Sequence, residues 1–195
     1  MKLESICVYC GSNTGAAPSY VDAARAMGRT LAERGVRLVY GGGQVGLMGV
    51  VADACLEAGG RVVGVIPNFL HQKEVAHPRV DDMRIVTSMH ERKLMMAEES
   101  DAFVAMPGGL GTMEELFEVW TWSQLGRHEK PVGVLNVNGY YDGLMDFLDH
   151  MRGEGFVEAK HRGMLKCAET PDAIVDALEA YEFPGMIATL ERAQT

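Results

Sequence analysis

The chain has 195 residues, a formal net charge of −9 at pH 7, 47% hydrophobic residues and 23% charged residues. Because nucleic-acid binding needs a basic face, this acidic balance argues against broad contact with nucleic acid, although a local basic pocket stays possible. No apolar run reaches the ~20 residues that span a bilayer, and the first residues lack the layout of a signal peptide, so we expect a cytoplasmic protein.

Seven apolar runs predict β-strands, and six segments with helical periodicity lie between or after them. In chain order, we expect strands over 5–10, 37–40, 61–66, 83–87, 102–106, 132–136 and 164–168, and helices over 18–34, 47–58, 90–99, 112–126, 141–152 and 171–181. Most of the strands are apolar throughout, which is typical of a parallel sheet covered on both faces. The alternation favours an α/β fold with a doubly wound, mostly parallel, Rossmann-like sheet and helices on both faces.

The length and this pattern predict one nucleotide-binding catalytic domain over residues 1–182, followed by a weakly patterned tail over residues 183–195. Residues 68–81 are polar and irregular, and we expect a surface loop there. Cys7 and Cys10 are spaced as C-x-x-C, but an offset of three along a strand places them on opposite faces. We interpret them as small core residues of a protein from a reducing compartment.

Glycine-rich turns follow three of the predicted strands. They contain Gly11-Ser12-Asn13, Gly41-Gly42-Gly43 and Pro107-Gly108-Gly109. Parallel strands end at the same edge of a sheet, and open α/β sheets bind their ligands there. The second turn also satisfies G-x-G-x-x-G, which suggests an NAD-dependent enzyme as one hypothesis, but the next strand ends without the acidic residue that would hold a ribose hydroxyl.

The third turn is the most informative, since it continues as Leu110-Gly111-Thr112-Met113-Glu114-Glu115 into a predicted helix. Glycines at a strand-to-helix turn let a ligand approach the backbone, and the first N–H groups of the helix attract phosphate. Thr112 and Glu115 fit the T-x-x-E capping box, so capping of the helix and a catalytic role are both open for Glu115.

A second charged segment, Met89-His90-Glu91-Arg92-Lys93, opens another predicted helix. Cations near the start of a helix oppose its dipole, which points to an anionic ligand or a carboxylate partner for Arg92 and Lys93. The alternative is an ordinary exposed charged face. The six histidines show no metal-ligand spacing, and we expect no catalytic metal.

Together, these motifs resemble the LOG family of cytokinin riboside 5′-monophosphate phosphoribohydrolases, which was formerly labelled a lysine decarboxylase family. The segment 107–115 matches P-G-G-x-G-T-x-x-E, and the segment 89–93 matches M-H-x-R-K; the resemblance covers roughly residues 5 to 180. It implies hydrolysis of the N-glycosidic bond between base and ribose 5-phosphate, with no cofactor.

The resemblance also implies the site residues. Catalytic roles fall on Arg92 and Glu115, while substrate and phosphate binding falls on Ser12, Gly43, Met89, Lys93, Gly108, Gly109, Gly111, Thr112 and Glu114, with Glu74 and Thr121 as looser matches. It implies a homodimer that acts on a nucleoside 5′-monophosphate, with the site close to the subunit interface. The preferred base and the role of Arg92 stay open, and a non-catalytic nucleotide sensor or carrier is the alternative.

Overall fold

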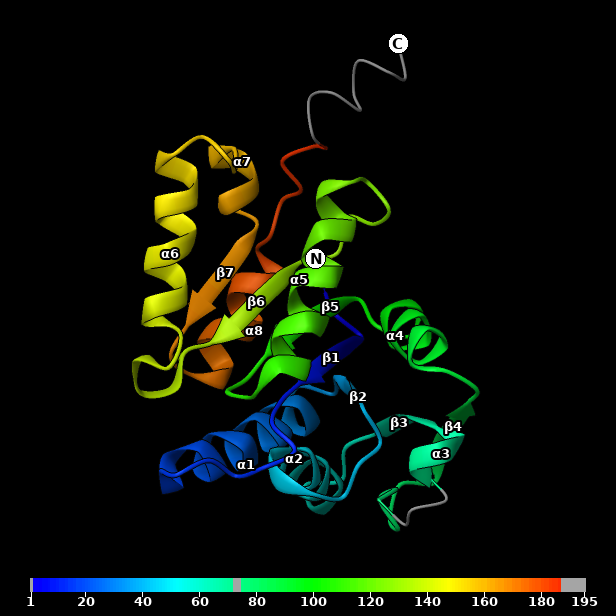
Figure 1. The fold of residues 1–195 in the computed structure, drawn as a ribbon. Helices are drawn as coiled ribbons and strands as arrows, with labels where there is room; N and C mark the ends of the chain where they lie inside the picture. Colours follow the sequence, from blue (N-terminus) through cyan, green and yellow to red (C-terminus); the bar gives the residue numbers. More distant parts are fainter. Residues whose placement is uncertain (1, 72–74, 187–195) are drawn as a thin grey trace.

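A seven-stranded parallel sheet forms the centre of the molecule, as seen in a computed structural model that describes residues 2–71 and 75–186 (Figure 1). The strand order is β4-β3-β2-β1-β5-β6-β7. The chain therefore winds outward from β1 in one direction as far as β4, crosses back to β5, and continues in the other direction to β7. The adjacent strands β1 and β5 mark the point where the winding direction changes.

The strands are β1 (Ser5–Tyr9), β2 (Arg37–Tyr40), β3 (Val62–Pro67), β4 (Asp82–Val86), β5 (Ala102–Ala105), β6 (Val132–Leu135) and β7 (Leu165–Ala168). The helices are α1 (Pro18–Glu33), α2 (Gly46–Glu57), α3 (Asn68–His71), α4 (Met89–Glu98), α5 (Leu110–Gln124), α6 (Asp142–Gly153), α7 (Ala159–Arg162) and α8 (Pro171–Glu179), with a 3-10 turn η1 (Val137–Gly139).

Alternation along the strands divides the apolar core into two layers. In β1, Ile6 and Val8 belong to the layer beneath α1, α2 and α8, whereas Cys7 and Tyr9 belong to the layer beneath α4, α5 and α6. Cys10 lies in the first layer and both cysteines are buried, which confirms that they are core residues on opposite faces. The strands β3, β5 and β6 are apolar and buried throughout because helices cover both faces of the sheet there, whereas the edge strand β4 carries Asp82 and Arg84.

The doubly wound fold and all seven strands are confirmed, and every strand pair in the sheet is parallel. The expectation of an irregular loop over 68–81 was wrong at its start, because α3 occupies Asn68–His71. The expected helix at 112 was also wrong in its start, since α5 begins at Leu110. Of the predicted tail, residues 187–195 lie outside the described residues.

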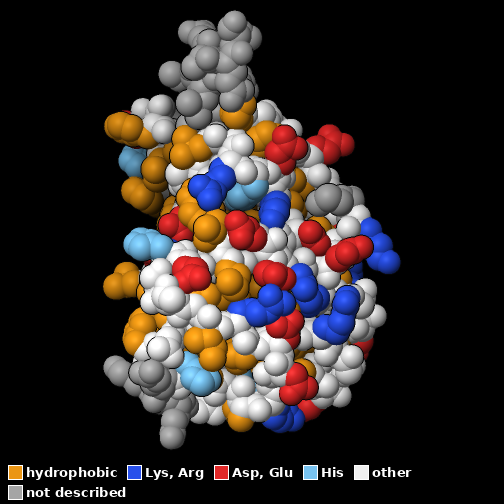
Figure 2. All heavy atoms as spheres, turned by 90° about the vertical axis from the view of Figure 1, so that its right-hand side faces the viewer, with side chains coloured by type: hydrophobic (Ala, Val, Ile, Leu, Met, Phe, Trp, Pro, Cys, Tyr) orange, Lys and Arg blue, Asp and Glu red, His pale blue; other side chains and the backbone are white. Residues whose placement is uncertain are grey.

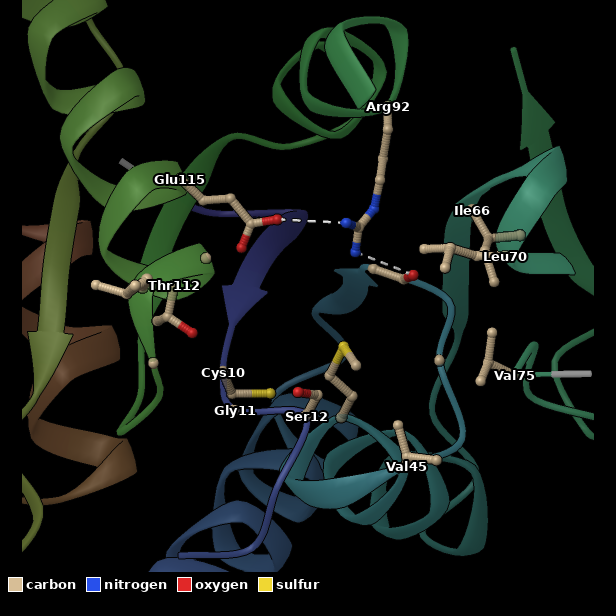
Figure 3. A pocket seen from close by; sticks show the side chains of 16 residues that line it. Cys10, Gly11, Ser12, Val45, Ile66, Leu70, Val75, Arg92, Thr112 and Glu115 are labelled. Atoms are coloured by element: carbon tan, nitrogen blue, oxygen red, sulfur yellow. Dashed lines mark hydrogen bonds and ion pairs between the residues drawn. The ribbon is translucent and has the colours of Figure 1, made fainter. Parts of the chain in front are cut away.

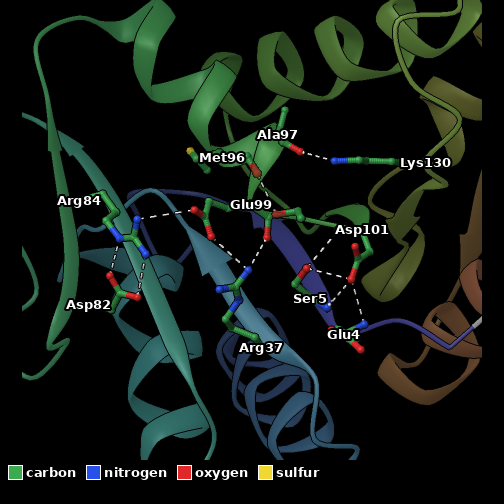
Figure 4. Close-up of polar contacts among 11 residues, drawn as sticks. Glu4, Ser5, Arg37, Asp82, Arg84, Met96, Ala97, Glu99, Asp101 and Lys130 are labelled. Carbon is green, nitrogen blue, oxygen red and sulfur yellow. Dashed lines mark hydrogen bonds and ion pairs between the residues drawn. The ribbon is translucent and has the colours of Figure 1, made fainter.

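Polar contacts fasten the amino-terminal edge of the sheet, opposite the glycine-rich turns (Figure 4). The Asp101 carboxylate accepts hydrogen bonds from the backbone N–H groups of Glu4 and Ser5 and from the Ser5 hydroxyl. Arg37 donates to the backbone carbonyl of Glu99 at 2.8 Å and forms an ion pair with its carboxylate at 3.1 Å. These contacts tie β1 and β2 to the segment that enters β5.

Acidic and basic side chains lie interspersed on the face that carries β4 and α4 (Figure 2). Arg84, for example, pairs with Asp82 on its own strand and with Glu99 after α4. Within residues 2–71 and 75–186, no helix is both long enough and apolar enough to cross a membrane.

Candidate functional site

The carboxyl edge of the sheet holds a cavity of about 400 Å³ on the side where β1, β2 and β3 end (Figure 3). It lies beside the junction of β1 and β5, where the loops after these two strands are joined by a hydrogen bond from the Gly11 N–H to the Pro107 carbonyl at 3.1 Å. Ligands of open α/β sheets bind at such a switch point. The cavity is lined by Cys10, Gly11, Ser12, Gly41, Gly43, Val45, Met48, Ile66, Leu70, Val75, Arg92, Gly109, Leu110, Gly111, Thr112 and Glu115.

The N-terminus of α5 forms one wall of this cavity. Gly109 is the N-cap with extended backbone angles, and no side chain of the described residues forms a capping hydrogen bond there. Thr112 is therefore already inside the first turn, and the capping-box interpretation of Thr112 and Glu115 was wrong. The first N–H groups of a helix have no acceptor within the helix, so this uncapped end offers them to a ligand in the cavity.

Arg92 enters the cavity from α4 and is held on two sides by backbone. Its Nε donates to the carbonyl of Val65 at 3.1 Å, and its Nη2 donates to the carbonyl of Gly41 at 3.1 Å. A Cβ at Gly41 would collide with the guanidinium, so glycine is required there for close approach. The remaining nitrogen, Nη1, lies 3.7 Å from Oε1 of Glu115 (Figure 3).

Glu115 is the acidic group of the cavity, and its side chain is only 12% exposed. Burial raises the pKa of its carboxyl group from 4.5 to about 7, against the opposing effect of the Arg92 charge, which lowers it. Burial is the dominant cause because a carboxylate loses its hydration in a low-dielectric site. Near neutral pH the group therefore populates both its protonated and its ionised form, as an acid–base catalyst requires.

Lys93 follows Arg92 on α4 but faces a different neighbour. Its Nζ forms ion pairs with Glu114 at 2.5 Å and with Glu118 at 3.0 Å, and it does not line the cavity. The neighbouring residues of each helix therefore have different roles. Arg92 and Glu115 meet in the cavity, while Lys93 and Glu114 join α4 to α5 beside it. Both cations are buried, so the alternative of an ordinary exposed charged face was wrong.

The other residues named from the sequence are placed as follows. Ser12, Gly43, Gly109, Gly111 and Thr112 line the cavity together with Arg92 and Glu115, whereas Gly108 lines a smaller pocket next to it. Met89 lies outside the lining, with its Sδ 4.0 Å from Nη1 of Arg92. Thr121 is exposed further along α5, away from the lining residues, and Glu74 lies outside the described residues.

An apolar wall faces the polar one, and sequence reasoning did not identify its residues. Figure 3 shows Ile66, Leu70, Val75 and Val45 on the side opposite Thr112 and Glu115. Val75 is brought in by the segment that follows α3, because the Gln44 N–H donates to the Val75 carbonyl at 2.9 Å and Gly43 bridges to Ala76. Ile66 was signalled by its position at the end of β3, which was predicted to lie at the binding edge, and Leu70 and Val75 lie within residues 68–81, where a surface loop was expected.

Within the described part of the chain, no group of three or more His, Cys, Asp or Glu side chains is placed to hold a metal ion. Among the described residues that line the cavity, the polar groups are the Arg92 guanidinium, the Glu115 carboxyl group of raised pKa, the hydroxyls of Ser12 and Thr112, and a run of glycine backbone. Such a set can bind an anion at the helix terminus and stabilise positive charge beside the carboxylate.

The fold and this cavity define a Rossmann-like α/β protein with a glycine-rich turn and a helix N-terminus beside a buried Arg–Glu pair. A family model described as "Possible lysine decarboxylase" matches residues 48–178. The chain is 51% identical over 180 residues to the cytokinin riboside 5′-monophosphate phosphoribohydrolase LOG of Oryza sativa subsp. japonica, covering 92% of this chain and 74% of that protein. It is 49% identical to a protein of the same description, LOG3 of Arabidopsis thaliana, over 92% of this chain and 84% of that one. The chain therefore belongs to the family of these phosphoribohydrolases.

Solved structures share the fold at lower identity. The molybdenum cofactor binding protein of Rippkaea orientalis matches with a TM-score of 0.70 at 22% identity, covering 92% of this chain and 98% of that one. The molybdenum cofactor carrier protein of Chlamydomonas reinhardtii matches with a TM-score of 0.68 at 22% identity, covering 91% and 98%. At these identities the likeness extends to the fold alone.

Proposed function

We propose that this chain is a hydrolase that cleaves the N-glycosidic bond of N6-modified adenosine 5′-monophosphates. The products are the free base and ribose 5-phosphate. The observation that carries the proposal is the buried carboxyl group of Glu115, which faces Arg92 in a cavity bounded by the uncapped N-terminus of α5. Two relatives that are about 50% identical to this chain over 180 residues are named as phosphoribohydrolases, which supports the same reaction.

In this proposal the 5′-phosphate binds at the N-terminus of α5. Gly109, Gly111 and Thr112 line the cavity at the end of the helix where the dipole favours negative charge, and their backbone N–H groups would donate to the phosphate oxygens. Because the phosphate is remote from the reacting bond, its binding energy holds the ribose in place for the chemical step.

Glu115 acts on the glycosidic bond itself. As the bond from C1′ to the base nitrogen breaks, the electron pair leaves with the base and positive charge builds on the ribose ring, as in glycoside hydrolysis. The Glu115 carboxylate stabilises that charge and accepts a proton from the water whose oxygen bonds to C1′. The departing base takes up a proton at the nitrogen that was bonded to ribose, so the overall reaction consumes one water.

Arg92 is a positioning residue for this carboxylate. Two of its nitrogens are engaged by backbone carbonyls at the ends of β2 and β3, which leaves Nη1 facing Glu115. Its positive charge also lowers the pKa of Glu115 and so enlarges the ionised fraction at neutral pH. The apolar wall of Ile66, Leu70 and Val75 is left for the base and its N6 substituent.

The test is product analysis with purified protein. Isopentenyladenosine 5′-monophosphate and AMP are incubated separately, and free base and ribose 5-phosphate are quantified by chromatography. We expect release from at least one nucleotide, loss of release in Glu115→Gln, and full release in the control Glu154→Gln, which changes an exposed carboxylate after α6. Tight nucleotide binding without any release would contradict hydrolysis and favour the sensor or carrier hypothesis.

We also propose that the chain forms a cytoplasmic homodimer. Phe117 on α5 and Leu125 at its C-cap are 36% and 47% exposed, which supports a second copy packing on this helix. The thiols of the four cysteines are free, as a reducing compartment favours. Light scattering coupled to size-exclusion chromatography tests the dimer, and a mass of a single chain at micromolar concentration would contradict it.

A further inference from the structure

Two consecutive tyrosines outside the cavity bind the loop that leads into α5. Tyr140 and Tyr141 lie between the 3-10 turn η1 and α6, at the carboxyl edge of β6. The Tyr140 hydroxyl donates to the carbonyl of Gly108 at 2.5 Å, and the Tyr141 hydroxyl donates to the carbonyl of Met106 at 2.7 Å. The carbonyl between these two, that of Pro107, accepts from the Gly11 N–H at 3.1 Å.

Three successive carbonyls of this loop therefore have donors from other parts of the chain. A carbonyl oxygen carries partial negative charge and would repel a phosphate group if it turned toward one. A peptide unit is planar and trans, so its C=O and N–H point in opposite directions. The Tyr140 hydroxyl that fixes the direction of the Gly108 carbonyl consequently also fixes the direction of the Gly109 N–H, which lies at the opposite edge of the same planar peptide unit.

The tyrosines are themselves held firmly. Tyr141 is 1% exposed, and its backbone N–H donates to Oδ1 of Asn136 at 2.7 Å, while the Asn136 amide donates to Asp142 at 2.7 Å. The Tyr140 ring packs edge-on against Tyr141 and Tyr20, with centroid distances of 5.0 Å and 5.8 Å. Packing therefore sets the hydroxyl positions before any ligand arrives, which limits the entropy lost on binding.

We propose that Tyr140 and Tyr141 are positioning residues that preorganise the segment from Met106 to Gly109 for the phosphate group of the ligand. The inference rests on the proposed role of the α5 N-terminus in phosphate binding. It extends the site to a connection that supplies none of the residues lining the 400 Å³ cavity.

Tyr140→Phe tests the proposal. The Tyr140 side chain is partly exposed and the variant keeps its ring, so only the hydroxyl group and its hydrogen bond are removed. Calorimetry on the full chain measures binding of ribose 5-phosphate and, separately, of adenine. Losing one neutral hydrogen bond corresponds to about a fivefold effect, so we expect Kd for ribose 5-phosphate to rise about fivefold and Kd for adenine to stay within about twofold. In turnover, KM should rise by a similar factor while kcat changes by less than about twofold.

Tyr181→Phe is the matched control, since it removes a tyrosine hydroxyl near the amino-terminal edge of the sheet. It should leave both dissociation constants unchanged. Tyr141→Phe is the second variant, and we expect weaker ribose 5-phosphate binding there as well, because the hydrogen bond to the Met106 carbonyl is lost.

Three outcomes overturn the inference: wild-type protein that does not bind ribose 5-phosphate, equal binding by Tyr140→Phe, or equal weakening for ribose 5-phosphate and adenine, which would indicate a general structural role. If the wild type binds ribose 5-phosphate more tightly than Tyr140→Phe does, yet releases no base from any nucleotide, the proposed hydrolysis fails and the positioning role stands.

Discussion

Replacing Glu115 with glutamine should change how the stability of the protein depends on pH. Burial raises the pKa of the Glu115 carboxyl from 4.5 to about 7 in the folded chain. Between these two values the folded protein keeps a proton that the unfolded chain has released. The free energy of unfolding therefore falls as pH rises through this window and becomes level above about pH 7.

The magnitude follows from the displacement of the pKa. At about 1.4 kcal/mol for each pKa unit, ionising Glu115 in the folded protein costs about 3 kcal/mol of stability, of which about 2.5 kcal/mol is lost between about pH 5 and pH 8. No discount for solvent is needed, because the side chain is 12% exposed. Glutamine does not titrate, so Glu115→Gln should lack this loss while its hydrolytic activity disappears.

Urea unfolding of both proteins near pH 5 and near pH 8 provides the measurement. Relative to wild type, Glu115→Gln should gain about 2.5 kcal/mol on going from the lower to the higher pH, with equal m-values. Glu154→Gln should show no such change. A stability difference between wild type and Glu115→Gln that is the same at both pH values would refute a raised pKa at this residue.

Further predictions concern activity, ligand binding and the opposite edge of the sheet. Hydrolysis by the wild type should fall about tenfold for each pH unit below about 7, because the ionised form of Glu115 is required; a flat profile down to pH 5 would contradict this. Arg92→Lys should lower kcat at least about tenfold, since lysine lacks the forked guanidinium that contacts two backbone carbonyls and the Glu115 carboxylate at once. An unchanged kcat would contradict a role of Arg92 in the reaction. Gly108→Ala should weaken AMP binding in calorimetry, because the new Cβ would collide with Thr112, whereas Gly143→Ala, which meets open space, should bind AMP as wild type does. Asp101→Ala should lower the free energy of unfolding by about 1–3 kcal/mol in urea titrations without changing KM, and a change in KM would show that the two edges are coupled.

Sequence reasoning recovered the sheet because buried parallel strands are apolar on both faces and end in recognisable turns. It misplaced the start of α5, since Thr112 and Glu115 match a capping box while Gly108 and Gly109 are free to adopt either helical or extended angles. Only the fold shows that Gly109 is extended and that the chain becomes helical at Leu110.

The candidate site was recovered in part. Arg92 and Glu115 were found through their motifs. Hydrophobic periodicity could not have paired them, because it carries no information about contacts between separate helices. Tyr140 was missed, and Val75 was not named individually, since both approach the cavity region through long-range contacts, with Gly108 and Gln44 respectively. Lys93 was expected at the ligand, yet its two carboxylate partners could be known only from the packing of α4 on α5.

In the connection from β4 to β5, the number of residues determines where the side chain of Arg92 points. This connection is the step that passes over β3, β2 and β1, and α4 carries Arg92 along it to the carbonyls at the ends of β2 and β3. Each residue added to a helix turns everything beyond it by about 100°. A single insertion between Met89 and Arg92 would thus direct the guanidinium away from Glu115 while leaving every strand in place. Insertions and deletions should consequently be far less tolerated in this crossover than in the solvent-exposed turn between α6 and α7.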